Sequence, residues 1–182
     1  MKKICVFAGS NSGTNPLYQE QAAELGKAFA REGIELVYGG ATSGLMGVIA
    51  DTILEHGGHV TGIMPSVLAH QEASHQGLTE LIEVDTMHER KAKMSELSDG
   101  YIALPGGFGT LEELFEALSW AQIGLHTKPI GLFNVAGYYT PFINMVEHAV
   151  EAGFVQQANL SLFLPVEDPD QLLREMNAYH RE

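Results

Sequence analysis

Short apolar runs alternate with longer amphipathic stretches along the whole chain. The apolar runs predict strands at about 4–8, 35–38, 60–64, 78–84, 101–104, 129–134 and 162–164. The amphipathic stretches, bounded by glycine or proline, predict helices at about 16–32, 45–56, 87–97, 111–121, 139–152 and 169–179. Strands that alternate with helices are typical of a parallel sheet covered by helices on both faces. The pattern therefore predicts an α/β fold: one Rossmann-like domain over residues 1–182, with a doubly wound, mainly parallel sheet and a loop at 65–77.

Glycine-containing turns follow three of the predicted strands, at 9–13, 39–44 and 106–109. In such sheets ligands bind at the carboxyl ends of the strands. The third turn joins a strand directly to a helix, where glycines let the backbone approach a ligand and the helix start offers free N–H groups to a phosphate. The turns lack the Gly-Lys-Ser/Thr of a Walker motif and a clean Gly-x-Gly-x-x-Gly before a helix, so the pattern does not favour a dinucleotide cofactor.

Two carboxylates, Glu112 and Glu113, follow the third turn within the first turn of its helix. On one interpretation Thr110 is the N-cap and Glu113 completes a capping box, while Glu112 complements the helix dipole. On the other, a carboxylate beside a bound phosphate is repelled by it and has a second role. Glu113 would then reach past the phosphate to a sugar.

The predicted helix at 87–97 carries an unusual face. Met87, Arg90, Lys91 and Met94 lie on the same side of it. Two cations beside two methionines suit a pocket that meets both a phosphate and a flat apolar base. The alternative is an amphipathic helix whose basic side chains extend their charged ends to water.

Composition and charge indicate which binding partners and which cellular compartment to expect. The chain has 10 basic and 23 acidic residues, a net charge of −13, and no basic stripe, so we expect neither nucleic acid nor an anionic membrane as a partner. No apolar run approaches the roughly 18 residues of a membrane span, and the run after Lys2-Lys3 is too short for a signal peptide. Cys5, the single cysteine, cannot form an intramolecular disulfide, which fits a cytoplasmic protein.

The two motifs together carry a family resemblance. Residues 105–113, Pro-Gly-Gly-Phe-Gly-Thr-Leu-Glu-Glu, and residues 87–91, Met-His-Glu-Arg-Lys, resemble the paired signatures of the LOG ("Lonely Guy") family. Members of that family are cytokinin riboside 5′-monophosphate phosphoribohydrolases, often mislabelled lysine decarboxylases. Gly9-Ser10, residues 39–47 and residues 120–124 are also similar to the family, so the resemblance covers about residues 4–150.

The resemblance implies hydrolysis of the N-glycosidic bond of an adenine-type nucleoside 5′-monophosphate, either AMP or a cytokinin nucleotide, to free base and ribose 5-phosphate. Arg90 and Glu113 match the catalytic pair. The substrate-binding residues expected from the resemblance and the glycine turns are Gly9, Ser10, Gly40, Met87, Lys91, Gly106, Gly107, Gly109, Thr110 and Glu112. The resemblance requires no cofactor or metal, and it implies a homodimer with sites near the subunit interface, compatible with the apolar Trp120, Ile123 and Leu125.

Three other functions stay open at this point. A pyridoxal-phosphate-dependent lysine decarboxylase needs a Schiff-base lysine, and only Lys91 lies near the proposed site. A non-catalytic nucleotide carrier or sensor would use the same glycine turns but gain little from Glu113. A metal site at His70, Glu72 and His75 lacks any standard ligand spacing, and a polar lid over the base explains that loop more simply.

Overall fold

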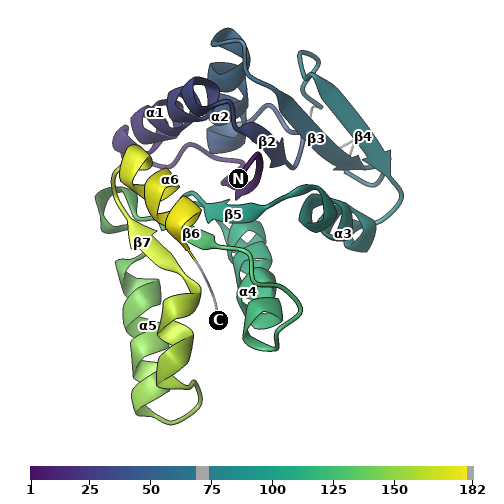
Figure 1. Ribbon diagram of the computed structural model, residues 1–182. Helices are drawn as coiled ribbons and strands as arrows, with labels where there is room; N and C mark the ends of the chain where they lie inside the picture. Colours follow the sequence, from purple (N-terminus) through teal and green to yellow (C-terminus); the bar gives the residue numbers. More distant parts are fainter. Residues whose placement is uncertain (69–73, 180–182) are drawn as a thin grey trace.

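The computed structural model describes residues 1–68 and 74–179, and its strands form a single parallel sheet (Figure 1). The strands are β1 (Lys3–Phe7), β2 (Glu35–Tyr38), β3 (Val60–Pro65), β4 (Glu80–Val84), β5 (Gly100–Ala103), β6 (Ile130–Phe133) and β7 (Leu164–Val166). The helices are α1 (Leu17–Glu32), α2 (Gly44–Glu55), α3 (Met87–Leu97), α4 (Phe108–Gln122), α5 (Thr140–Glu151) and α6 (Pro169–Ala178), with 3-10 turns at Val135–Gly137 and Gln157–Leu162. The predicted α/β fold with a parallel sheet is confirmed.

Each face of the sheet has its own hydrophobic core because side chains alternate along every strand. In β1, Ile4 and Val6 pack toward α1, α2 and α6, whereas Cys5 and Phe7 pack toward α3, α4 and α5. The strands are apolar on both sides for this reason, as expected of a parallel sheet covered by helices. Figure 1 shows the two helical layers on opposite sides of the sheet.

The strand order β4-β3-β2-β1-β5-β6-β7 changes direction at β1. From β1 the chain first builds outward through β2, β3 and β4, and then returns through α3 to place β5 on the other side of β1. Ligands of open α/β sheets bind outside the carboxyl ends of the strands at such a reversal. The fold therefore directs attention to the turns that follow β1 and β5.

Predicted boundaries differ from the observed ones by up to three residues, and two of the differences have a structural reason. The helix expected from Leu111 begins at Phe108, because Gly107 takes the N-cap position in extended conformation. The last strand covers Leu164–Val166 and not residues 162–164, where the chain still completes a 3-10 turn. Pro165 is tolerated in β7 because that strand is at the edge of the sheet, where one row of backbone N–H groups has no ladder partner. Within the described ranges, no helix combines the length and the apolar character needed to cross a bilayer.

Candidate functional site

The three glycine turns meet at the carboxyl edge of the sheet, as predicted. The N–H of Gly9 donates to the carbonyl oxygen of Pro105 at 3.1 Å, and the N–H of Leu45 donates to the carbonyl oxygen of Gly9 at 3.0 Å. A Cβ atom on Gly44 would lie 2.4 Å from the backbone nitrogen of Asn11, and Gly44 has a φ of +60°. Glycine is needed here because the backbones touch, so the turns after β1, β2 and β5 form one compact unit.

The start of α4 lies at the centre of this unit. Gly107 is its N-cap, and Leu111 makes the first backbone hydrogen bond of the helix, to the Gly107 carbonyl oxygen at 3.1 Å. Thr110 is therefore inside the helix, where its side chain is buried against Gly106. The capping-box interpretation of Thr110 and Glu113 was wrong, because neither residue occupies the position that this motif requires. The first N–H groups of α4 remain available to an anion.

Arg90 approaches the same edge of the sheet from α3. It is 7% exposed, and its Nη1 lies 3.9 Å from the sulfur of Met87. Its Nε is buried without a hydrogen-bond partner among the described residues, which is costly for a charged group unless a ligand supplies an acceptor. A Cβ atom on Gly39 would lie 1.9 Å from Nη2 of Arg90, so the turn after β2 makes the space for the guanidinium group.

Glu113 faces the same cavity from α4. Burial raises the pKa of its carboxyl from 4.5 to about 7, and the negative charges of Glu112 and Glu116 act in the same direction. Arg90 and Lys91 oppose this shift. A carboxyl group whose pKa lies near neutrality can accept or release a proton under physiological conditions, which is the requirement for general acid–base catalysis.

One cavity of about 400 Å³ brings most of the predicted residues together. This volume is within the range of about 300–1,000 Å³ that is typical of small-molecule sites. Of the predicted residues, the cavity is lined by Ser10, Met87, Arg90, Gly107, Gly109, Thr110, Glu112 and Glu113. The other lining residues include Asn11, Met46, Leu68 and the 93% exposed Phe108. Arg90 and Glu113 thus belong to the walls of a single site.

The remaining predicted residues lie around this cavity. Gly9 and Gly106 line an adjoining cavity of about 270 Å³, which shares Ser10, Asn11 and Gly107 with the first. Gly40 packs near Met64 of β3 and accepts a hydrogen bond from the N–H of His75 at 2.9 Å.

Lys91 is the last of the predicted set. Its Nζ lies 2.6 Å from Glu112 Oε1 and 2.7 Å from Glu116 Oε2, so it contacts α4 instead of the main cavity.

The sequence patterns did not single out Gly39, although its space holds Arg90. The available signal was the pair of glycines directly after β2, of which only Gly40 was chosen. The idea of a metal site rested partly on His70 and Glu72, which lie outside the described residues. His75 instead bonds Asp51, with 2.7 Å between Nε2 and Oδ1. Across residues 1–68 and 74–179, no three His, Cys, Asp or Glu side chains are grouped closely enough to hold a metal ion.

Comparisons with known proteins identify the family of this chain. A family model described as "Possible lysine decarboxylase" matches residues 46–176. The Arabidopsis thaliana protein named cytokinin riboside 5′-monophosphate phosphoribohydrolase LOG7 is 42% identical over 181 residues, which is 100% of this chain and 83% of that protein. The Oryza sativa subsp. japonica protein named cytokinin riboside 5′-monophosphate phosphoribohydrolase LOG is 42% identical over 178 residues, covering 98% of this chain and 74% of its own length.

Solved structures share the fold at lower identity. The molybdenum cofactor binding protein from the phototrophic bacterium Rippkaea orientalis superposes with a TM-score of 0.71 at 24% identity, covering 98% of this chain and 97% of that chain. The molybdenum cofactor carrier protein from Chlamydomonas reinhardtii has a TM-score of 0.70 at 21% identity, with 98% and 99% coverage. These likenesses concern the architecture alone. The matched family model and the full-length relatives show that this chain belongs to the LOG family, whose model carries the description of possible lysine decarboxylases.

Proposed function

We propose that this protein hydrolyses the N-glycosidic bond of adenine-type nucleoside 5′-monophosphates, AMP or a cytokinin riboside monophosphate, and releases the free base and ribose 5-phosphate. The observation that carries the proposal is that Arg90 and Glu113 line one cavity together with the glycine turn at the start of α4. Relatives named for this activity at 42% identity support it.

The substrate phosphate fits the part of the site where Arg90 faces the start of α4. At a net charge of −13 the protein as a whole repels an anion, so capture has to be local. The free N–H groups at the start of α4 and the buried guanidinium of Arg90 are the groups that can supply it. Arginine suits this role because its planar fork can hold two oxygen atoms at once. Phosphate binding then positions the sugar against Glu113.

Glu113 supplies the chemistry at the anomeric carbon. As the C1′–N bond breaks, its electron pair leaves with the base and the ribose acquires oxocarbenium character, which a nearby carboxylate stabilises. The same carboxylate takes a proton from the attacking water, whose oxygen forms the new bond to C1′. The departing base takes its proton from solvent. The pKa of about 7 keeps part of Glu113 ionised and ready for this role at neutral pH.

A Schiff-base lysine is not favoured at this site. Burial disfavours the charged form of Lys91, but hydrogen bonds to Glu112 and Glu116 outweigh it, and the pKa of Lys91 is raised above its ordinary value. A lysine that forms a Schiff base needs the opposite, a neutral amine at working pH. A nucleotide carrier is the second alternative, and Glu113 disfavours it because a carboxylate beside the site weakens anion binding.

The direct test is incubation of the purified protein with AMP and, separately, with isopentenyladenosine monophosphate, followed by chromatography for free base. We expect release from at least one nucleotide, and comparison of the two rates identifies the preferred substrate. Absence of free base with both, when binding of either is measurable by calorimetry, would favour the carrier. A yellow protein with the absorption of an aldimine would favour the decarboxylase.

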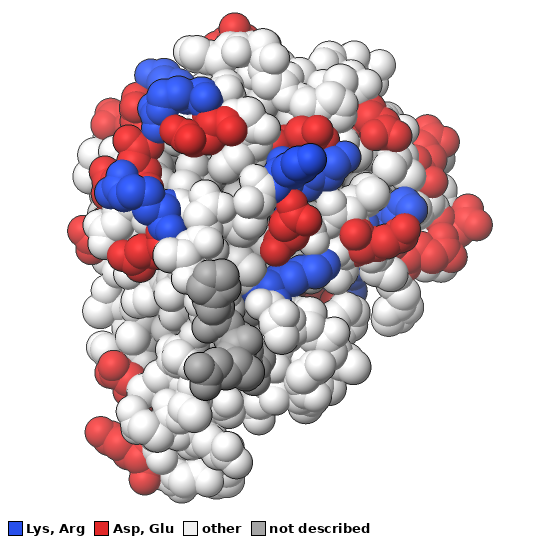
Figure 2. Space-filling view, in the orientation of Figure 1, with Lys and Arg blue, Asp and Glu red and all other residues white. Residues whose placement is uncertain are grey.

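We also propose that the protein is a homodimer in the cytoplasm. An apolar groove between α4 and α5 is lined by Leu111, Phe115, Tyr138, Tyr139, Pro141, Phe142 and Met145. Figure 2 shows few charges on the lower part of the molecule apart from acidic side chains along its left edge, whereas charges of both signs crowd the upper part. Two copies that each carry −13 meet with least repulsion on such a face.

A further inference from the structure

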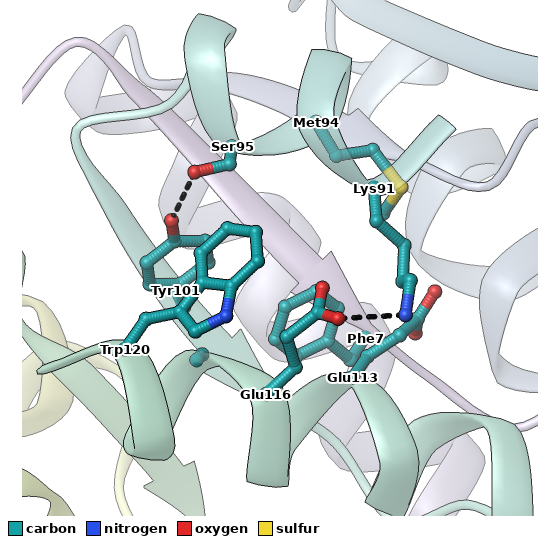
Figure 3. Close-up of a pocket in the computed structure, with 9 residues that line it drawn as sticks. Phe7, Lys91, Met94, Ser95, Tyr101, Glu113, Glu116 and Trp120 are labelled. Atoms are coloured by element: carbon teal, nitrogen blue, oxygen red, sulfur yellow. Dashed lines mark hydrogen bonds and ion pairs between the residues drawn. The ribbon is translucent and has the colours of Figure 1, made fainter. Parts of the chain in front are cut away.

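Lys91 lies beside the candidate site as a fixed positive charge between α3 and α4. Its side chain is 13% exposed and is bonded to both Glu112 and Glu116, as Figure 3 shows for the second pair. The Glu116 side chain is 26% exposed, so this pair is the more shielded of the two. Shielding from water strengthens the interaction and makes it costly to remove one partner alone.

Glu113 is the neighbour of this ion pair. It forms part of the wall between the main cavity and a smaller cavity, shown in Figure 3, that is also lined by Lys91 and Glu116. The smaller cavity is otherwise mainly apolar, with Phe7, Met94 and Trp120 around it, which explains the loss of hydration at Glu113. The charged or titratable groups that act on Glu113 are Arg90 and Lys91 of α3, Glu112 and Glu116 of α4, and Cys5 of β1.

We propose that Lys91 and Glu116 are positioning residues for Glu113. Their ion pair holds α4 against α3, so that Glu113 faces Arg90 across the cavity. The positive charge of Lys91 and the negative charge of Glu116 offset each other beside the Glu113 carboxyl group, which can therefore take up a proton. This inference rests on the proposed hydrolysis. It gives Lys91 a different role from the substrate contact that the family resemblance implies, and it adds Glu116, which the sequence patterns did not single out.

The two partners act on Glu113 with opposite sign. Lys91 favours the ionised carboxylate, whereas Glu116 disfavours it by repulsion. Removal of Lys91 takes away the attraction and also leaves Glu112 and Glu116 uncompensated, so the pKa of Glu113 rises. Removal of Glu116 takes away a repulsion, so that pKa falls. A purely structural role would affect stability in both variants but would not produce shifts in opposite directions.

The test compares Lys91→Met and Glu116→Gln by two measurements. The first is a carbon-13 NMR titration of protein labelled at the glutamate carboxyl carbon, with the Glu113 signal assigned by its loss in Glu113→Gln. The second is the acidic limb of the pH profile of kcat. We expect both midpoints to move to higher pH by about one pH unit in Lys91→Met and to lower pH in Glu116→Gln. The matched control is Lys93→Met, since Lys93 is on the same helix and pairs with Glu96 there.

Each outcome is decisive. Unchanged midpoints in both variants, or shifts in the same direction, overturn the positioning role. Lys91→Arg keeps the charge and is expected to keep the wild-type midpoint, so it serves together with Glu116→Gln if Lys91→Met does not fold. The NMR midpoints do not depend on turnover. If no nucleotide is hydrolysed, the proposed function fails while the titration still decides whether this pair sets the ionisation of Glu113.

Discussion

Helix α4 borders two regions of opposite character. Toward α3 it presents Glu112, Glu113 and Glu116, which meet Arg90 and Lys91. Toward α5 it presents apolar side chains, and the ring of Phe115 lies edge-on to that of Phe142 with centroids 5.4 Å apart. One side holds charges that are partly withdrawn from water and the other exposes apolar surface, and each departs from what stability alone would select. A half-buried carboxyl with a raised pKa indicates chemistry, and an exposed apolar groove indicates association.

The largest expected effect is on turnover, on the charged side of α4. In Glu113→Gln we expect kcat to fall by about 10²–10⁴-fold, because the amide can neither accept the proton from water nor stabilise positive charge on the ribose. Nucleotide binding should persist, which calorimetry with AMP can check. The control is Glu147→Gln, an exposed change on α5 outside the cavity, which should leave kcat unchanged. Normal turnover in Glu113→Gln would leave this carboxyl without a catalytic role.

A substitution on the apolar side of α4 should change the oligomeric state instead of turnover. Phe115→Lys places a charge in the groove, and we expect the dimer to dissociate at concentrations at which the wild type remains paired, a loss of about 2 kcal/mol or more. Light scattering after gel filtration measures the mass. Gln171→Lys, an exposed change on α6 across the sheet, is the control and should leave the mass unchanged. A wild-type monomer at micromolar concentration, or a Phe115→Lys dimer, would contradict the use of this groove for pairing.

The sequence alone predicts part of this arrangement. Alternating apolar runs and glycine turns were sufficient for the sheet and its carboxyl-edge site, because both signals are local in the chain. The motif Pro105–Glu113 and the segment 87–94 placed Arg90 and Glu113 in one site. The start of α4 was missed because Gly107 and Thr110 are both acceptable N-caps, and only the packing of Thr110 on Gly106 decides between them.

What the sequence could not provide were contacts between distant segments. The space that Gly39 leaves for Arg90 depends on α3 crossing the end of β2, 51 residues later in the chain. The pairing of Lys91 with Glu112 and Glu116 depends in the same way on the angle between α3 and α4. The predicted substrate contact of Lys91 followed from its place in a motif, whereas its neighbours in space are carboxylates.

The last effect concerns the stability that the raised pKa of Glu113 costs the folded protein at high pH. Because the pKa of Glu113 is raised from 4.5 to about 7, the folded protein binds a proton that the unfolded chain releases between these values. Stability contributed by this group therefore falls as pH rises through that window. Glu113→Gln removes the cost, so we expect its free energy of unfolding to exceed that of the wild type at pH 8 by about 2–3 kcal/mol, and by about 2 kcal/mol less at pH 5.5. Urea unfolding at the two pH values measures the difference, with the exposed Glu147→Gln of α5 as control. An equal gain in the free energy of unfolding at both pH values would show that the carboxyl of Glu113 is solvated. The two sides of α4 would then not differ in the cost of removing charge from water.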